Sequence, residues 1–299
     1  MYNKKNIIIG TTAINRPELH NDNIKEWHDW INNIDKSKYD LHWFINIDYV
    51  SKLPFSIEET KNNLLNIITQ IPITFLQSTD NSGNFLKACQ RVSTNIENYV
   101  NNNNLNHDDV IIIWLEDDWK LNKQNIPLEN LIDNYLSGLT SINLSFLRPN
   151  YIHALAPSII NYNLWKLLHL EAWKKQINHF DPEHCVGLYF IKNFTKYELI
   201  NNLTIISDYK SVDENYFRSK FLNYKNSFYT YQPNSKNNIF KHNFVKPNEI
   251  TNFFNNKITF VRITPTFCLN GVSYGRNYMN KYNITKTKIQ NNNNINFYN

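Results

Sequence analysis

Two hydrophobic periodicities alternate along the first 120 residues or so. Short runs of β-branched and aromatic residues, such as Ile7-Ile8-Ile9, are typical of buried strands. Between them lie segments in which apolar residues recur every three or four positions, as on one face of a helix. This alternation predicts βαβ units around a mostly parallel sheet, and therefore an α/β fold. We expect strands at 7–10, 41–48, 73–76 and 110–115, and helices at 23–34, 57–71 and 84–100.

The second half of the chain has a more mixed pattern. A helix is expected to open at Asp181-Pro182-Glu183, because Asp is a good N-cap and Pro is favoured at the first helical position. Further strands are expected at 144–147, 154–160 and 258–263, and further helices at 164–175 and 212–222. We find no Pro/Gly/Ser-rich linker, so a single domain over residues 1–288 is expected. The Asn-rich tail at 289–299 is expected to be disordered.

The most informative strand is the one at 110–115, because three carboxylates follow it directly. Glu116, Asp117 and Asp118 come after a run of apolar residues. In open α/β sheets, ligands bind outside the carboxyl ends of the strands. Three adjacent acids repel one another unless a cation neutralises them, and hard divalent cations prefer oxygen ligands. The motif predicts a site for a metal-bound diphosphate, with an ordinary acidic turn as the alternative.

Composition narrows the classes of function. The formal net charge of +5 is spread along the chain without the basic stripe of a nucleic-acid-binding protein, so no nucleic-acid partner is expected. Glycine, with 6 residues, is too scarce for a fold built on Gly-rich phosphate loops. Three cysteines without metal-type spacing imply no disulfide framework. With no apolar run of about 20 residues and no signal-like start, we expect a cytoplasmic, soluble protein.

Four segments, taken in order, resemble a GT-A-type, nucleotide-sugar-dependent glycosyltransferase. Residues 11–17 (TTAINRP) look like its donor-base loop, and residues 41–48 (LHWFINID) look like its second strand, which ends in an acid. Residues 81–88 (NSGNFLKA) are similar to the segment that enters the helix before the metal motif. Glu116-Asp117-Asp118 stands where the family has its DxD motif, with Glu in the first position. The resemblance covers residues 6–195.

The resemblance implies a Rossmann-type, mostly parallel sheet flanked by helices, with a donor half at about 1–120 and a mixed acceptor half at 121–288. It also implies transfer of a sugar from a nucleotide diphosphate donor, with UDP favoured, to an acceptor hydroxyl, in glycan synthesis. The donor-binding residues that it implies are Thr11, Thr12, Ala13, Arg16, Asp48, Asn84, Lys87, Glu116, Asp117 and Arg276.

A divalent cation, Mn²⁺ or Mg²⁺, is the cofactor that the resemblance implies. Asp118 would reach the metal, Glu116 would support it, and His242 would be a late additional ligand. The bound cation would neutralise the charge that develops on the leaving diphosphate. An inverting enzyme also needs a base for the acceptor hydroxyl. Glu183 is the candidate base, and Asp213, in the pair Asp213-Glu214, is the second candidate.

Several of these residues have a second, structural interpretation. Asp181 and Glu183 could simply stabilise a helix N-terminus. Arg16 could pair with a nearby acid instead of facing the donor. Asp117 could point away from the ligand, and His242 could be a lone surface histidine.

Three other functions compete with sugar transfer. A nucleotidyltransferase would normally carry a Gly-rich basic loop after the first strand, which this chain lacks. A glycoside hydrolase uses two spaced carboxylates, and contiguous acids fit a metal better. A catalytically inactive carbohydrate- or nucleotide-binding protein could share the same fold.

Overall fold

A computed structural model describes residues 4–78, 84–121, 127–136, 138–144 and 157–175, residues 182 and 185, several later strands, and residues 278–282. In chain order, the elements are β1 (Lys5–Ile14), α1 (Pro17–Asn32), β2 (Tyr39–Asp48), α2 (Ile57–Ile67), β3 (Ile73–Gln77), α3 (Phe85–Asn102), a 3-10 turn (His107–Asp109), β4 (Val110–Glu116), β5 (Lys120–Leu121), α4 (Leu128–Tyr135), β6 (Leu139–Asn143), β7 (Ser158–Asn161), α5 (Tyr162–Trp165), a π-helical segment (Lys166–Leu170), α6 (Glu171–Lys175), β8 (Leu199–Ile206), β9 (Phe228–Pro233), β10 (Phe240–Val245), β11 (Ile258–Ile263) and β12 (Cys268–Leu269).

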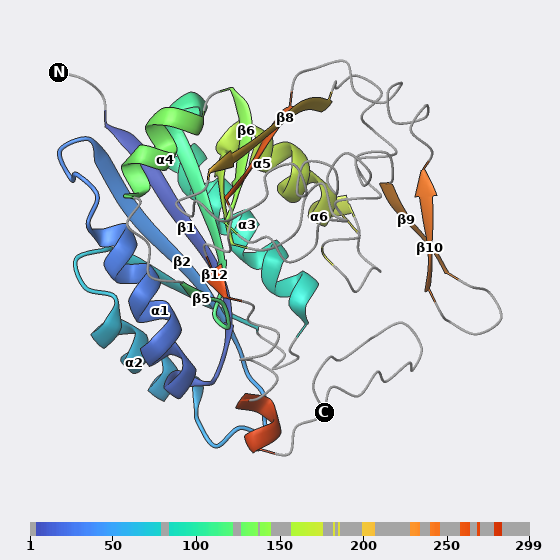
Figure 1. Ribbon diagram of the computed structural model, residues 1–299. Helices are drawn as coiled ribbons and strands as arrows, with labels where there is room; N and C mark the ends of the chain where they lie inside the picture. The colour runs from blue at the N-terminus through green and yellow to red at the C-terminus, as the bar shows by residue number, and fades with distance from the viewer. Residues whose placement is uncertain are drawn as a thin grey trace.

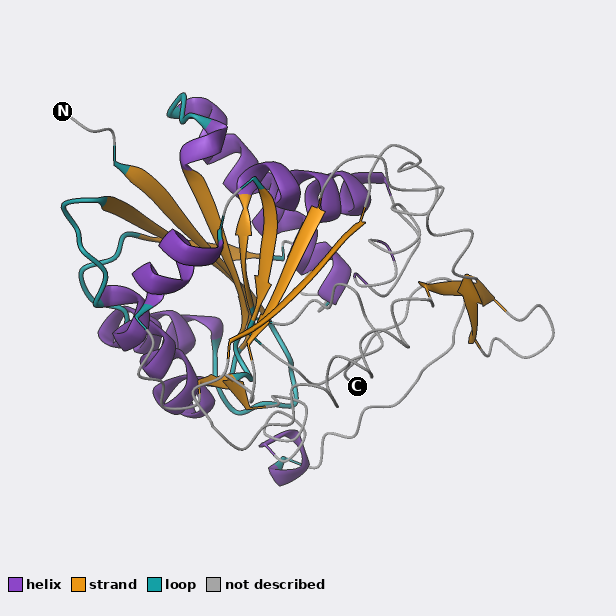
Figure 2. Cartoon of the chain, turned by 45° about the horizontal axis from the view of Figure 1, so that its top comes forward, coloured by secondary structure: helices purple, strands orange, loops and turns teal. Residues whose placement is uncertain are grey.

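Eight of these strands form one sheet in the order β3-β2-β1-β4-β7-β6-β11-β8 (Figure 1). Strand β7 runs antiparallel to both of its neighbours, β4 and β6, and the other neighbouring pairs are parallel. Helices cover both sides of the sheet (Figure 2). The predicted α/β fold class is confirmed. In the part of the chain that the structure describes, no helix has the length and apolar character needed to cross a bilayer.

The strands of the first half lie where the pattern predicts them, and the helix ends differ. Helix α1 begins at Pro17, six residues before the predicted start, because buried polar residues such as His20 and Asn23 interrupt its apolar pattern. Helix α2 ends at Ile67 instead of residue 71, before Gln70 takes a positive φ of 63°. Its start is fixed by a capping box, in which Ser56 and Glu59 exchange hydrogen bonds.

The second half departs further from the prediction. The expected helix at 164–175 is interrupted by the π-helical segment Lys166–Leu170. Strand β6 lies at Leu139–Asn143, just before the expected strand at 144–147, while β11 occupies the predicted range. Helix α4 and strands β8, β9 and β10 were not predicted. The expected helix at 212–222 and the tail at 289–299 lie outside the described residues.

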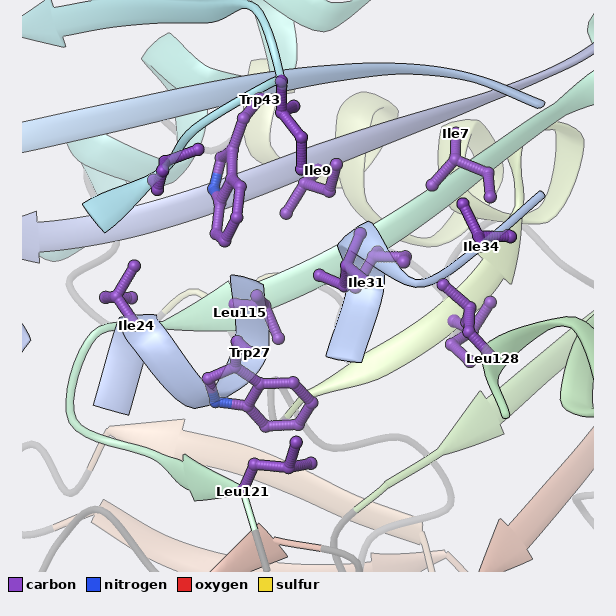
Figure 3. Close-up of a cluster of buried hydrophobic side chains, with 14 of the residues drawn as sticks. Ile7, Ile9, Ile24, Trp27, Ile31, Ile34, Trp43, Leu115, Leu121 and Leu128 are labelled. Atoms are coloured by element: carbon purple, nitrogen blue, oxygen red, sulfur yellow. The ribbon is translucent and has the colours of Figure 1, made fainter. Parts of the chain in front are cut away.

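Side chains of β1 and β4 alternate between two buried clusters, one on each face of the sheet. Ile7 and Ile9 share a cluster with side chains of α1, α2 and α4 (Figure 3). Ile8 belongs to the cluster on the opposite face, which contains side chains of α3. Burying each isoleucine contributes about 1.5–3 kcal/mol to folding. This two-sided burial explains the uninterrupted apolar runs in the sequence, and it fixes the strand register on which the site depends.

Candidate active site

The site lies where β1, β2 and β4 end side by side at the carboxyl edge of the sheet. Strand register places Ile14 opposite Asp48 and Thr12 opposite Glu116. Just beyond β4, the Asp117 amide donates a hydrogen bond to the Thr12 carbonyl, with an N···O distance of 3.1 Å. The predicted acids of two different strands therefore flank the end of β1.

Asp117 points into the protein and is held by three groups. Its carboxylate accepts hydrogen bonds from Arg16 Nε at 2.8 Å and from the Ile14 amide at 3.2 Å, and His20 Nε2 lies 2.9 Å away. A second guanidinium nitrogen of Arg16 completes a bidentate ion pair. Burial acts to raise the pKa of Asp117, but Arg16 and His20 outweigh it, so the pKa lies below its usual range. This geometry favours the second interpretation of Asp117, in which its side chain points away from the ligand.

Arg16 is the partner that this arrangement requires. Its side chain is 4% exposed, so it faces acids and not solvent. Besides Asp117 it reaches Asp118, with an Nη2–Oδ2 distance of 3.5 Å. In this structure Arg16 therefore follows its second interpretation, that of an ion-pair partner.

Asp118 and Glu116 are the two acids of the motif that remain open to the outside. The Asp118 side chain is 23% exposed. Burial and the neighbouring Asp117 raise its pKa above the usual range, although Arg16 opposes the shift. Glu116 is partly buried, and its Oε2 accepts a hydrogen bond of 2.9 Å from the indole N–H of Trp119. The carboxylates of Glu116 and Asp118, with one residue between them, thus lie at the carboxyl edge of the sheet.

Helix α1 supports residues 116–119, which we call the acidic loop. The Asn23 amide donates to the Asp117 carbonyl at 3.2 Å, and the Trp27 indole donates to the Trp119 carbonyl at 2.8 Å. With His20, these residues form one buried face of the helix. Sequence analysis missed His20 and Asn23 as site residues. The available signal was spacing. Asn23 and Trp27 follow His20 by three and seven positions, which places all three side chains on one side of a helix.

Replacing Trp27 with Phe should destabilise the protein more than the same change at Trp114. Both indoles are fully buried, but the Trp114 N–H has no hydrogen-bond partner among the described residues. Replacing Trp27 leaves the Trp119 carbonyl without its hydrogen-bond donor. We therefore expect Trp27→Phe to lower the free energy of unfolding by about 1–3 kcal/mol more than Trp114→Phe. Urea denaturation of the two variants measures the difference. Equal costs would show that this hydrogen bond contributes nothing.

Asp48 is held by a second polar cluster at the end of β2. Arg91 of α3 donates through Nε to Asn46 Oδ1 at 2.7 Å and forms an ion pair with Asp48. Asn46 in turn donates to Asp48 at 3.0 Å. Burial raises the pKa of Asp48, and Arg91 opposes this by stabilising the carboxylate. Arg91 was missed from sequence, because nothing in its own helix shows that it meets β2.

Arg91→Met should loosen this cluster. It removes the cation from a buried carboxylate, so we expect a loss of about 1–3 kcal/mol, partly relieved by protonation of Asp48. Lys174→Met is the control, since the Lys174–Glu97 pair is more exposed and should be worth at most about 1 kcal/mol. Thermal unfolding at neutral pH compares the two. A loss for Arg91→Met no larger than the control would contradict a supporting role.

The remaining predicted donor residues of the first half lie at the end of β1 and at the start of α3. Thr11 is buried, and its Oγ1 accepts from the Trp43 indole at 2.8 Å. Thr12 and Ala13 are also buried. Asn84 caps α3, with its side-chain oxygen 3.0 Å from the Lys87 amide, and Lys87 is exposed. None of these contacts tests donor binding.

Four predicted residues lie outside the described residues: Glu183, Asp213, Glu214 and Arg276. His242 belongs to β10, which pairs with β9 in a separate two-stranded sheet, and its side chain is not described. Among the side chains that the structure describes, no group of three or more His, Cys, Asp or Glu could hold a metal ion.

Comparison with known proteins finds similarity in structure only. No protein-family model matches the chain, and no curated protein sequence matches it. Among solved structures, TarS of S. aureus (residues 1–349) is 12% identical, with a TM-score of 0.42, over 73% of this chain and 71% of that one.

Two further glycosyltransferase structures are similar at the same level. The mannosyltransferase PcManGT from Pyrobaculum calidifontis, in complex with GDP-Man and Mn²⁺, is 10% identical with a TM-score of 0.40, over 64% of this chain and 53% of that one. The galactosyltransferase LgtC is 11% identical with a TM-score of 0.36, over 61% and 69%. The chain therefore spans about half the length of PcManGT. Because these TM-scores lie below 0.5, the similarities add nothing to the fold that the strand order already shows.

Proposed function

We propose that this protein is a glycosyltransferase that transfers a sugar from a nucleotide diphosphate donor, preferably a UDP-sugar, to an acceptor hydroxyl. One observation carries the proposal. The ends of β1, β2 and β4 bring Asp48, Glu116 and Asp118 to one edge of the sheet, and Asp118 stays partly exposed there. In α/β sheets this edge is where ligands bind.

The carboxylates available at this site fit a divalent cation that is also bound by the substrate. With Asp117 committed to Arg16, the protein offers Glu116 and Asp118. Mg²⁺ and similar cations are commonly held by one or two carboxylates, with phosphate oxygens and water completing the shell. When bound, the cation would supply Lewis-acid neutralisation of the leaving diphosphate. The role of the chain is to hold the two carboxylates in place through Trp119 and helix α1.

We assign the acceptor base to Glu183, with Asp213 as the second candidate. What supports Glu183 is the burial of its neighbours. Pro182 is buried, and its carbonyl accepts from the Trp173 indole at 3.1 Å. Cys185 is buried in the cluster on the α3 face, together with Cys89. Burial raises the pKa of the Cys89 thiol in this cluster, and the charge of Glu116 adds to the shift.

The proposal is tested by titrating the protein with UDP and GDP, each with and without Mn²⁺, and following the unfolding midpoint. Solved neighbours hold GDP-Man and UDP-GlcNAc, so both nucleotides belong in the panel. A ligand that binds only the folded state at 100 times its Kd stabilises it by about 2.7 kcal/mol. We expect a Mn²⁺-dependent rise for UDP. No rise with either nucleotide would overturn the donor site.

A second assay separates an enzyme from a binding protein. Incubation with UDP-sugars and Mn²⁺ should release UDP, slowly to water and faster once a suitable acceptor is present. Tight nucleotide binding with no release of UDP from any donor would identify a protein that has the fold without turnover.

A further inference from the structure

A helical turn near the C-terminus packs against the loops that follow β1 and β2. Met279, in the turn at 278–281, is buried in a small apolar cluster with Ile14, Val50 and Leu53. Tyr282 meets Phe55 edge to face, with ring centroids 6.4 Å apart. Figure 1 shows this turn in red, at the end of the molecule where those loops lie. We call residues 278–282 the C-terminal turn.

Glu18 ties the C-terminal turn to the first turn of α1. Lys281 Nζ lies 2.9 Å from Glu18 Oε2, and the Tyr282 hydroxyl donates to the same oxygen at 3.0 Å. These hydrogen bonds, Lys281 foremost, lower the pKa of Glu18 below its usual range. The carboxylate is therefore ionised at neutral pH and holds both donors.

The segment at residues 14–18 contacts the C-terminal turn on one side and the acidic loop on the other. The Ile14 side chain belongs to the same apolar cluster as Met279, while the Ile14 amide donates to the Asp117 carboxylate. Two residues later, Arg16 pairs with Asp117 and Asp118. Residues 14–18 thus link the C-terminal turn to the acidic loop.

Asn15 stiffens this segment. Its side-chain amide donates to the carbonyls of Val50 and Phe55, at 3.2 and 2.5 Å, and its oxygen accepts from the Val50 amide at 2.7 Å. These hydrogen bonds fix the segment to residues 50–55, and Val50 and Leu53 also belong to the apolar cluster that contains Met279.

We infer that the C-terminal turn is a positioning element of the donor site, which holds residues 14–18 so that Arg16 and Ile14 keep Asp117, and through it Asp118, in place. The expected effect of the C-terminal turn on donor binding rests on the proposed function. The Lys281–Glu18 pair contributes little to global stability, because its side chains are 59% and 46% exposed and solvent weakens exposed ion pairs. Its effect should appear in local order at the acidic loop and in donor binding.

Charge reversal of the Lys281–Glu18 pair tests the inference. We expect Lys281→Glu and Glu18→Lys each to speed amide hydrogen exchange at 114–121 in the ligand-free protein. Each should also weaken Mn²⁺-dependent UDP binding by about 2- to 30-fold, the range for residues that modulate a coupled site. The double swap, Glu18→Lys with Lys281→Glu, restores an opposite-charge pair and should recover both. Lys25→Glu is the control, because Lys25 pairs with Asp29 on the same helix with similar exposure.

Two results would overturn the inference. One is exchange at 114–121 that is the same in Lys281→Glu as in Lys25→Glu. The other is faster exchange with unchanged UDP affinity, which would show that the turn orders the loop without serving the site. If the wild-type protein binds neither UDP nor GDP, the proposed function fails, and the exchange experiment still decides whether the coupling exists.

Discussion

Asp118→Asn is expected to abolish Mn²⁺-dependent nucleotide binding and to reduce sugar transfer by at least about 100-fold. Losing a group that merely supports a metal ligand costs about 10- to 100-fold, so losing a ligand should cost no less. The fold should survive. Burial and Asp117 already disfavour the Asp118 carboxylate, so a neutral amide should leave the free energy of unfolding unchanged or raise it.

Two measurements separate these effects: the unfolding midpoint without ligand, and the midpoint shift caused by UDP with Mn²⁺. Asp22→Asn is the matched control, because it makes the same change of charge at an exposed position of α1. It should leave both measurements at wild-type values. An Asp118→Asn protein that keeps the metal-dependent shift would remove Asp118 from the site.

Asp117→Ala should have the largest effect on stability. Removing one partner of a buried ion pair typically costs about 3–5 kcal/mol, because the remaining charge is left uncompensated. Here that charge is Arg16, and the Ile14 amide and His20 lose an acceptor as well. We expect denaturant unfolding to show a loss in this range for Asp117→Ala.

Asp40→Ala provides the comparison for an exposed pair. Lys4 and Asp40 are 42% and 59% exposed, so breaking this pair should cost no more than about 1 kcal/mol. The double variant Arg16→Met, Asp117→Leu should recover much of the loss, because apolar replacement of a whole buried pair is often neutral. If Asp117→Ala costs no more than Asp40→Ala, the buried pair is not what holds the loop.

The position of the acidic motif Glu116-Asp117-Asp118 follows from the hydrophobic pattern, but the roles of its three acids do not. The run from Val110 to Leu115 is buried on both sides, so its position and its termination at acids are visible in sequence. The three acids look equivalent there. Their roles separate only because Arg16 and His20, about 100 positions away, are brought against Asp117.

Helix α1 shows why supporting residues escape detection. His20 and Asn23 are buried as completely as Ile24, yet a polar residue at a buried position weakens the apolar periodicity used to find a helix. Arg91 is similar. Its partners, Asn46 and Asp48, lie on another strand, and a side chain's partner across a fold has no fixed sequence spacing.

The α/β class, the strands that carry the site and the acids at their ends all follow from the order of amino acids, because burial on both faces of a sheet forces continuous apolar runs that stop where the chain reaches solvent. Which acid is exposed and which is an internal anchor depends on the packing of distant segments. A buried carboxylate is stable only beside a cation and hydrogen-bond donors. For Asp117, those come from β1 and α1, which meet it only after the strands have paired.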